Sequence, residues 1–130
     1  RWGVYDAHDE IAHRYQSIIE AKQLGIYKDE YVVLNGVLIR YNGKNTEIAI
    51  PEGVKIIEEG TFCGAPITSV KCPSTLINIG KYSFAWCHEL QNVELNEGLE
   101  TIEKSAFYDC KNLQPITLPS SVTSVGMFAF

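Results

Sequence analysis

The sequence lacks the features that membrane-spanning proteins and most enzymes carry. No apolar run approaches the roughly 20 residues that span a bilayer, and the opening Arg1-Trp2 does not begin a basic and then apolar signal peptide. No phosphate-binding glycine loop, Gly-x-Ser-x-Gly or CxxC pair occurs. We therefore expect no direct membrane insertion, no enzymatic activity, no cofactor and no metal site. Because the first residue is not Met, we expect the chain to be part of a longer protein.

Basic residues are scarce where a nucleic acid would need them. Residues 1–46 carry six acidic and six basic side chains, whereas residues 47–130 carry ten acidic and five basic ones, all lysine. The net charge of −5 therefore arises entirely from the second part of the chain, which contains no arginine. Phosphate backbones and anionic membranes attract clustered Lys and Arg, so neither is an expected partner.

A phenylalanine recurs at a nearly constant spacing in this second part. It occupies positions 62, 84, 107 and 130, at intervals of 22, 23 and 23 residues, and aliphatic residues recur at the same intervals. A period in this range is the signature of a solenoid, in which each coil buries its apolar side chains against its neighbours. We therefore predict ladders of stacked phenylalanine and aliphatic side chains, with coils about 4.8 Å apart.

Each coil is expected to contain two extended stretches and one short helical turn. In the copy that starts at Leu90, the extended stretches are residues 90–96 and 99–102, and the turn is residues 105–110. The first coil is one residue shorter after Phe62, where Gly64-Ala65-Pro66 favours a tighter turn.

The segment before the repeats begins with an expected helix over residues 6–24. Asp6 is a suitable N-cap, and Gly25 is suited to end the helix in a left-handed conformation. Helical spacing places one group of mainly apolar side chains on a single face: Ile11, Tyr15, Ile18, Ile19 and Lys22.

A β-hairpin is expected to follow the helix. Asn35-Gly36 lies between two β-prone runs, which is the strongest short-range hairpin signal. A solenoid needs its first coil covered, because an open end exposes core side chains and unpaired strand edges. We therefore divide the chain into a helical cap or linker segment (residues 1–30), a capping hairpin (residues 31–46) and about four coils of which the last is incomplete (residues 47–130).

Two stretches of the repeats carry a family resemblance. SAFYDCKNL (residues 105–113) and ITLPSSVTSVG (residues 116–126) closely resemble the BspA-type, or Treponema pallidum-type, leucine-rich repeats. The general leucine-rich repeat has Asn or Cys where this chain has Thr75, Gly98 and Ser121, a departure that fits the BspA type and argues against the ribonuclease-inhibitor type.

This resemblance implies a right-handed leucine-rich-repeat solenoid of the α/β horseshoe class, rich in β-structure, with a parallel sheet and short helical turns. It also implies a non-enzymatic role, commonly bacterial surface adhesion or protein recognition. The family has no single set of binding residues, so none is transferred to this chain.

The four cysteines and the histidines are the remaining candidates for chemistry. Cys87 and Cys110 occupy the same repeat position, one coil apart and within disulfide range, but we favour reduced core residues. Cys72 takes an aliphatic core position, and Cys63, in the shortened turn, is expected to be the most exposed. Asp9 and His13 could chelate a metal weakly, although solvated helix surface is the favoured interpretation, and His88 has no partner in the sequence.

Two surfaces are candidates for binding. The outward positions of the first extended stretch form rows across the coils: Thr68, Gln91 and Gln114; Ser69, Asn92 and Pro115; and Lys71, Glu94 and Thr117. These mainly small polar groups suit a protein or glycan surface. The turn edge carries Tyr82, Trp86, Tyr108 and Phe128, which either anchor a partner or pack against their neighbours.

The sequence therefore predicts a binding or adhesion module that recognises a protein or glycan through a solenoid face, at the cell surface or secreted. The alternative is a structural spacer or scaffold for a neighbouring domain, and a cytoplasmic location stays open. Phe130 lies at a core position in the middle of a repeat, so the open C-terminal coil also predicts self-association.

Overall fold

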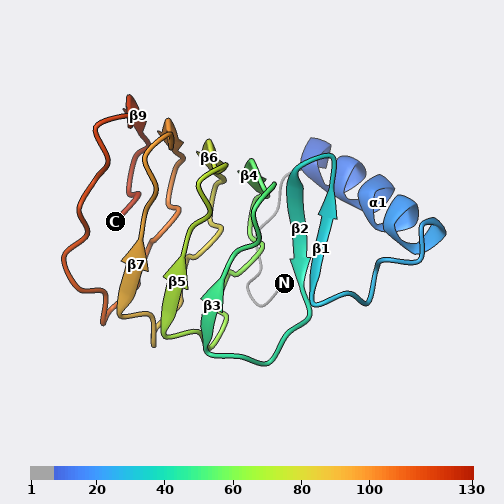
Figure 1. Cartoon of the computed structure of the whole chain (residues 1–130), viewed down its shortest axis with the longest axis horizontal. Coiled ribbons are helices and arrows are strands. Elements are labelled where there is room, and N and C mark those ends of the chain that lie inside the picture. Colours follow the sequence, from blue (N-terminus) through green and yellow to red (C-terminus); the bar gives the residue numbers. More distant parts are fainter. Residues whose placement is uncertain (1–7) are drawn as a thin grey trace.

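The chain forms a row of stacked coils with a hairpin and one helix at its N-terminal end (Figure 1). This computed structural model describes residues 8–130, with side chains from Tyr15 onward. The coils comprise residues 47–66, 67–89, 90–112 and 113–130. The predicted parallel solenoid of about four coils is thus confirmed.

The predicted helix is present as α1 (His8–Gln23). Gly25 ends it with a φ of +76°, and the N–H of Ile26 donates to the carbonyl of Ala21 over 3.0 Å. The predicted apolar face is only partly correct, since Ile18 and Ile19 are half-buried but Tyr15 is 67% exposed. Asp6 and the side chains of Asp9 and His13 lie outside the described part of the chain.

The predicted hairpin consists of β1 (Tyr31–Leu34) and β2 (Val37–Tyr41). The strands pair antiparallel, and Asn35 and Gly36 both have positive φ, as a two-residue turn of this kind requires. One face of the hairpin packs on the helix in a small separate core of Ala21, Val32, Leu34 and Ile39. β2 also pairs in parallel with the first coil, so the hairpin extends a solenoid sheet.

Two sheets form the sides of the solenoid. The second extended stretch of each coil continues the hairpin into a six-stranded sheet of order β1-β2-β4-β6-β8-β9, and the first stretch forms a three-stranded parallel sheet of order β3-β5-β7. The strands of the coils are β3 (Glu47–Ala49), β4 (Ile56–Ile57), β5 (Ser69–Lys71), β6 (Asn78–Ile79), β7 (Asn92–Glu94), β8 (Thr101–Ile102) and β9 (Ser124–Val125).

The third side of each coil consists of consecutive hydrogen-bonded turns. In the third coil, the N–H groups of Ala106 and Tyr108 donate to the carbonyls three residues earlier, over 3.2 and 3.1 Å. Residues with a left-handed backbone conformation (positive φ) recur at two positions of this side. They are Gly60 and Gly64 in the first coil, then Tyr82 and Trp86, then Ser105 and Asp109, and finally Phe128.

The predicted phenylalanine ladder runs through the core. The rings of Phe62, Phe84, Phe107 and Phe130 are stacked with centroid separations of 5.0, 5.1 and 5.3 Å and interplanar angles of 5° or less. Tyr41 of the hairpin continues the row, 5.5 Å from Phe62. The first three phenylalanines are fully buried, whereas Phe130 is 53% exposed at the end of the row.

The cysteines are free thiols whose burial differs in part from expectation. Cys72 and Cys87 are buried as predicted, but Cys63 is also fully buried, so its predicted exposure is wrong. The shortened turn lies against the second coil, because the N–H of Gly64 donates to the carbonyl of Ala85 over 2.7 Å. Cys110 is the one that is partly exposed, and its thiol donates to the carbonyl of Phe84 over 3.1 Å.

The fourth coil leaves β7 at the edge of its sheet. Gln114 still donates its N–H to the carbonyl of Gln91 over 2.8 Å, but Pro115 has no N–H to continue the ladder. Within the described chain, no backbone hydrogen bond joins residues 115–118 to β7. Leu118, expected in an aliphatic ladder, is therefore 45% exposed.

Candidate binding surfaces

The face formed by β3, β5 and β7 presents the predicted rows of polar side chains. Side chains alternate along each strand, so Val70 points into the core while Ser69 and Lys71 point outward. The register pairs Ser69 with Asn92 and Lys71 with Glu94. The sequence thus predicted correctly how these side chains line up across the second and third coils.

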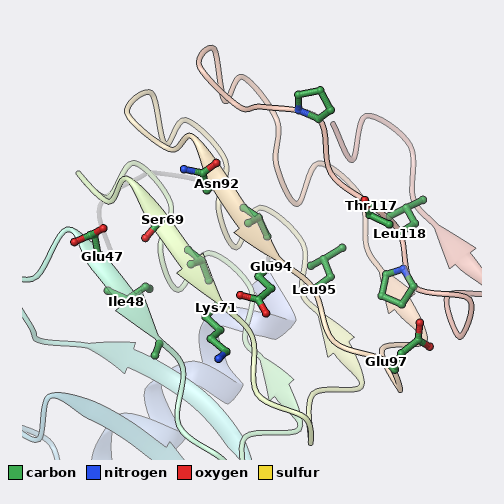
Figure 2. A pocket seen from close by; sticks show the side chains of 15 residues that line it. Glu47, Ile48, Ser69, Lys71, Asn92, Glu94, Leu95, Glu97, Thr117 and Leu118 are labelled. Atoms are coloured by element: carbon green, nitrogen blue, oxygen red, sulfur yellow. The ribbon is translucent and has the colours of Figure 1, made fainter.

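This face is hollowed into a groove of about 720 Å³. The three strands form its floor, and residues 115–119 of the fourth coil form one wall (Figure 2). Four of the predicted binding residues line it, namely Lys71, Asn92, Glu94 and Thr117. Thr68 and Gln91 lie outside it, and the Thr68 hydroxyl donates to the carbonyl of Thr46 over 3.2 Å.

Thr117 does not continue the row of Lys71 and Glu94 as a strand residue. The segment that contains it forms no strand, because Pro115 interrupts the ladder just before it. Thr117 instead lines the wall of the groove, away from the three strands of the floor. The sequence therefore identified a residue of the groove but predicted the wrong local structure for it.

The charged side chains around the groove are predominantly acidic. Glu47, Glu94 and Glu97 line it together with one basic side chain, Lys71. Glu97 lies at the rim and accepts a hydrogen bond from the hydroxyl of Ser120 over 3.2 Å. The groove therefore has a net negative charge that favours basic ligands.

The turn edge carries four aromatic side chains in a continuous row. The ring centroid of Trp86 lies 5.9 Å from that of Tyr82, with the rings nearly parallel, and 5.7 Å from that of Tyr108 in an edge-on contact. A further edge-on contact of 6.3 Å joins Tyr108 to Phe128. The rings thus pack against each other, yet Tyr108 and Phe128 remain 41% and 60% exposed.

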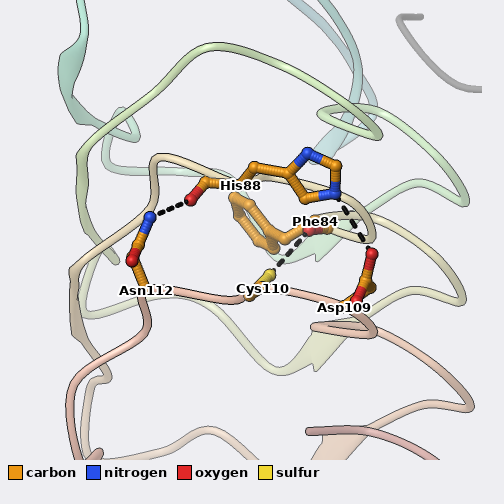
Figure 3. Close-up of polar contacts among 5 residues, drawn as sticks. All are labelled: Phe84, His88, Asp109, Cys110 and Asn112. Atoms are coloured by element: carbon orange, nitrogen blue, oxygen red, sulfur yellow. Dashed lines mark hydrogen bonds and ion pairs between the residues drawn. The ribbon is translucent and has the colours of Figure 1, made fainter.

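A polar contact joins two residues that follow these aromatics along the chain, His88 after Trp86 and Asp109 directly after Tyr108. His88 Nε2 is 3.1 Å from Asp109 Oδ2, and both side chains are partly exposed (Figure 3). The amide of Asn112 donates to the carbonyl of His88 over 2.7 Å and so fixes its backbone. The sequence did not indicate this partner for His88, because Asp109 is contributed by the next coil.

The thiols do not form a nucleophilic site. Burial raises the pKa of Cys72 to about 12 and that of Cys110 to about 11, and it also raises the pKa of Cys87. These thiols are therefore protonated at neutral pH. Among the side chains from Tyr15 onward, no group of three or more His, Cys, Asp or Glu could hold a metal ion, and no described helix is long and apolar enough to cross a membrane.

Stacked short strands, buried ladders at a 22- to 23-residue period and a parallel sheet define the class of a leucine-rich-repeat solenoid. The chain belongs to the BspA-type leucine-rich repeat family. A model of the BspA type leucine rich repeat region matches residues 40–130 in six copies. This membership supports a repeat binding or scaffold module of a kind that is typically non-enzymatic.

Solved structures of similar proteins come from several bacteria. A T. pallidum leucine-rich repeat protein is 31% identical, with a TM-score of 0.66, over 69% of this chain and 45% of that chain. A Bacteroides capillosus leucine-rich repeat protein is 30% identical, with a TM-score of 0.66, over 75% of this chain and 88% of that chain.

A leucine-rich cell surface protein from Faecalibacterium prausnitzii is 27% identical, with a TM-score of 0.70. The similarity covers 80% of this chain and 31% of that chain. This chain therefore spans less than half the length of the T. pallidum and F. prausnitzii proteins. No curated protein matches it.

Proposed function

We propose that the chain is a non-enzymatic binding module that recognises an extended segment of a partner protein in the groove over β3, β5 and β7. The observation that carries the proposal is the combination, in one groove, of outward polar side chains and an unpaired strand edge. A surface of this kind supplies backbone hydrogen bonds for affinity and side chains for selectivity.

The free edge of β7 has defined hydrogen-bonding groups. The N–H of Asn92 donates to the carbonyl of Thr68, and the carbonyl of Glu94 accepts from the N–H of Cys72. Thr68 and Cys72 directly flank β5, so Asn92 and Glu94 direct these backbone groups at the second coil. Alternation along a strand then directs the backbone groups of Val93 and Leu95 toward the fourth coil, where they form no backbone hydrogen bond to residues 115–118. An extended peptide satisfies such groups.

The charges of the groove indicate which peptide it favours. Three carboxylates and one lysine line it, so a segment with basic side chains meets the complementary charge. Val93, Leu95 and Leu118 add apolar surface along the same side. The expected ligand alternates basic and apolar residues, as an extended strand presents them to opposite sides.

The location that we propose is the cell surface or the secreted fraction of a bacterium. It is supported by the similar F. prausnitzii protein, which is a leucine-rich cell surface protein. Adhesion through the groove follows if the partner belongs to another cell. Protease treatment of intact cells that carry the full-length parent tests the location, because a surface repeat region is degraded and a cytoplasmic one is protected until lysis.

The groove itself is tested with a displayed library of random peptides of extended length. Selection on the chain is expected to enrich sequences that alternate basic and apolar residues, and their binding should fall at least tenfold when Glu94→Lys reverses a charge of the floor. Glu100→Lys, on an exposed position outside the groove, is the matched control and should leave binding unchanged. No enrichment, or equal binding by the Glu94→Lys variant, would favour the structural spacer instead.

A further inference from the structure

We infer that the aromatic turn edge formed by Tyr82, Trp86, Tyr108 and Phe128 is a second binding site, whose ligand is an uncharged saccharide. This site lies outside the groove of the proposed function and takes a ligand of different chemistry. It is built from three observations: the exposed ring row, the backbone conformation that presents it, and the polar pair that follows two of the rings along the chain.

The row of aromatic rings does not arise from a single position of the repeat. Tyr82 and Phe128 share one repeat position, Trp86 occupies a second and Tyr108 a third, so the rings come from three different positions and not from one ladder. The core ladder of phenylalanines is separate and already fills the interior. The edge aromatics therefore form a surface of their own, with Tyr108 41% exposed and Phe128 60% exposed.

The backbone beneath three of the rings is one that bulky residues rarely adopt. Tyr82, Trp86 and Phe128 have φ values of +55°, +58° and +59°, in the left-handed region. The first coil places Gly60 and Gly64 at the two equivalent positions, which is the residue that this conformation favours. Large aromatics at left-handed positions indicate a function for the side chains, because the turn itself is formed equally well by glycine.

The polar pair supplies the second half of a saccharide site. Asp109 directly follows Tyr108, and its backbone occupies the turn position of Trp86 one coil later. Only one of its carboxylate oxygens, Oδ2, contacts His88, through Nε2. In the part of the chain that the structure describes, the other oxygen and His88 Nδ1 have no hydrogen-bond partner. One acceptor and one imidazole nitrogen thus remain available on residues that follow Tyr108 and Trp86 along the chain.

A pyranose ring matches this combination. Its C–H groups form an apolar face that packs on the electron-rich face of an aromatic ring, and its hydroxyls both donate and accept hydrogen bonds at the rim. Asp109 and the net charge of −5 disfavour anionic saccharides, and no arginine in residues 47–130 is present to bind a sulfate or carboxylate. The ligand class is therefore a neutral oligosaccharide.

Tryptophan fluorescence tests the site directly. In a Trp2→Phe background Trp86 is the single tryptophan, so its emission reports on the edge. The probes are the neutral oligosaccharides cellohexaose, chitohexaose and maltoheptaose, with heparin as the anionic comparison. We expect a saturable change with at least one neutral probe and none with heparin.

Point variants test whether the saccharide binds at the aromatic turn edge. Tyr108→Ala and Asp109→Asn should each weaken the affinity at least tenfold while the melting temperature stays close to that of the parent, since both side chains are exposed. Lys71→Glu, in the groove, should leave the affinity unchanged, which separates this site from the proposed function. Binding of none of the three neutral probes, binding of heparin alone, or equal affinity in Tyr108→Ala would overturn the inference. So would a dimer that Tyr108→Ala dissociates, because it would assign the edge to a second copy of the chain.

Discussion

One carboxylate, that of Glu52, accepts two hydrogen bonds from one residue of the next coil, Ser74. The Ser74 N–H lies 3.0 Å from Oε1 and the hydroxyl 2.8 Å from Oε2. The same contact recurs two coils later between Glu97 and Ser120, at 3.3 and 3.2 Å. The second and third coils are instead joined by the amide of Asn96, which donates to the carbonyl of Leu76 over 2.9 Å. The same contact thus joins the first coil to the second and the third coil to the fourth.

This contact makes stability depend on pH. The hydrogen bonds from Ser74, first from its N–H and then from its hydroxyl, lower the pKa of Glu52. Because the pKa of Glu52 is lower in the folded state, its ionised carboxylate stabilises the fold at pH values above the ordinary pKa of Glu, about 4.3. This stabilisation is lost as the pH falls through the lower pKa of the folded state.

We therefore expect Glu52→Gln to lower the melting temperature at neutral pH and to have little effect well below the ordinary pKa of Glu. Thermal melts across this pH range measure the difference. Glu89→Gln removes the same charge from another exposed side chain and is the control. A melting temperature difference that stays constant with pH would refute the assigned role of the carboxylate.

The phenylalanine ladder predicts an ordered series of stability losses. Phe84 is fully buried and stacked on both sides, so Phe84→Ala leaves a cavity and should cost about 3–5 kcal/mol in the free energy of unfolding. Phe84→Leu keeps most of the volume and should cost less. Phe130→Leu, at the half-exposed end of the same row, is the control and should cost least. Urea denaturation measures the series, and equal losses at both positions would contradict it.

The raised pKa values of the thiols predict slow chemical modification. With pKa values of about 12 for Cys72 and about 11 for Cys110, about one thiol in a thousand or fewer is ionised near pH 8. We expect the folded chain to react with an aromatic disulfide reagent about 100-fold more slowly than the urea-unfolded chain, which should titrate four thiols. Rapid reaction of two or more thiols in the folded state would show that the coils open.

Local and periodic signals explain what the sequence could predict. Asn35-Gly36 determines its turn by itself, and the regular recurrence of phenylalanine requires only that equal coils stack. The sequence also explains why Thr117 does not continue the row of Lys71 and Glu94 as a strand residue. Pro115 lies in the preceding row, and its missing N–H removes the hydrogen bond on which a strand there would depend.

The candidate surfaces were less accessible from the sequence. The rows on β5 and β7 follow from strand alternation, but the groove depends on where the fourth coil departs from β7. His88 and Asp109 do not occupy equivalent positions of the repeat. Aligning the coils in the sequence therefore does not show that their side chains meet. Left-handed backbone at Tyr82 and Trp86 is equally hidden, because neither residue type favours that conformation.

The last prediction concerns this left-handed backbone and uses Ser105, which is buried with a φ of +56°. An L-residue in this region costs roughly 1–2 kcal/mol, and glycine avoids that cost but loses about 0.4–1 kcal/mol through its greater freedom in the unfolded chain. Ser105→Gly should therefore raise the free energy of unfolding by up to about 1.6 kcal/mol, whereas Ser105→Ala retains the strain and should not.

The first coil provides the reciprocal experiment, because Gly60 occupies the position equivalent to Ser105. Gly60→Ser should destabilise the chain by an amount similar to the strain that Ser105→Gly relieves. Urea denaturation of the single variants and of the double variant, in which the two effects should offset each other, measures both. If Ser105→Gly and Ser105→Ala changed stability equally, the turn would tolerate side chains without strain, and aromatics at positions 82, 86 and 128 would then need no functional explanation.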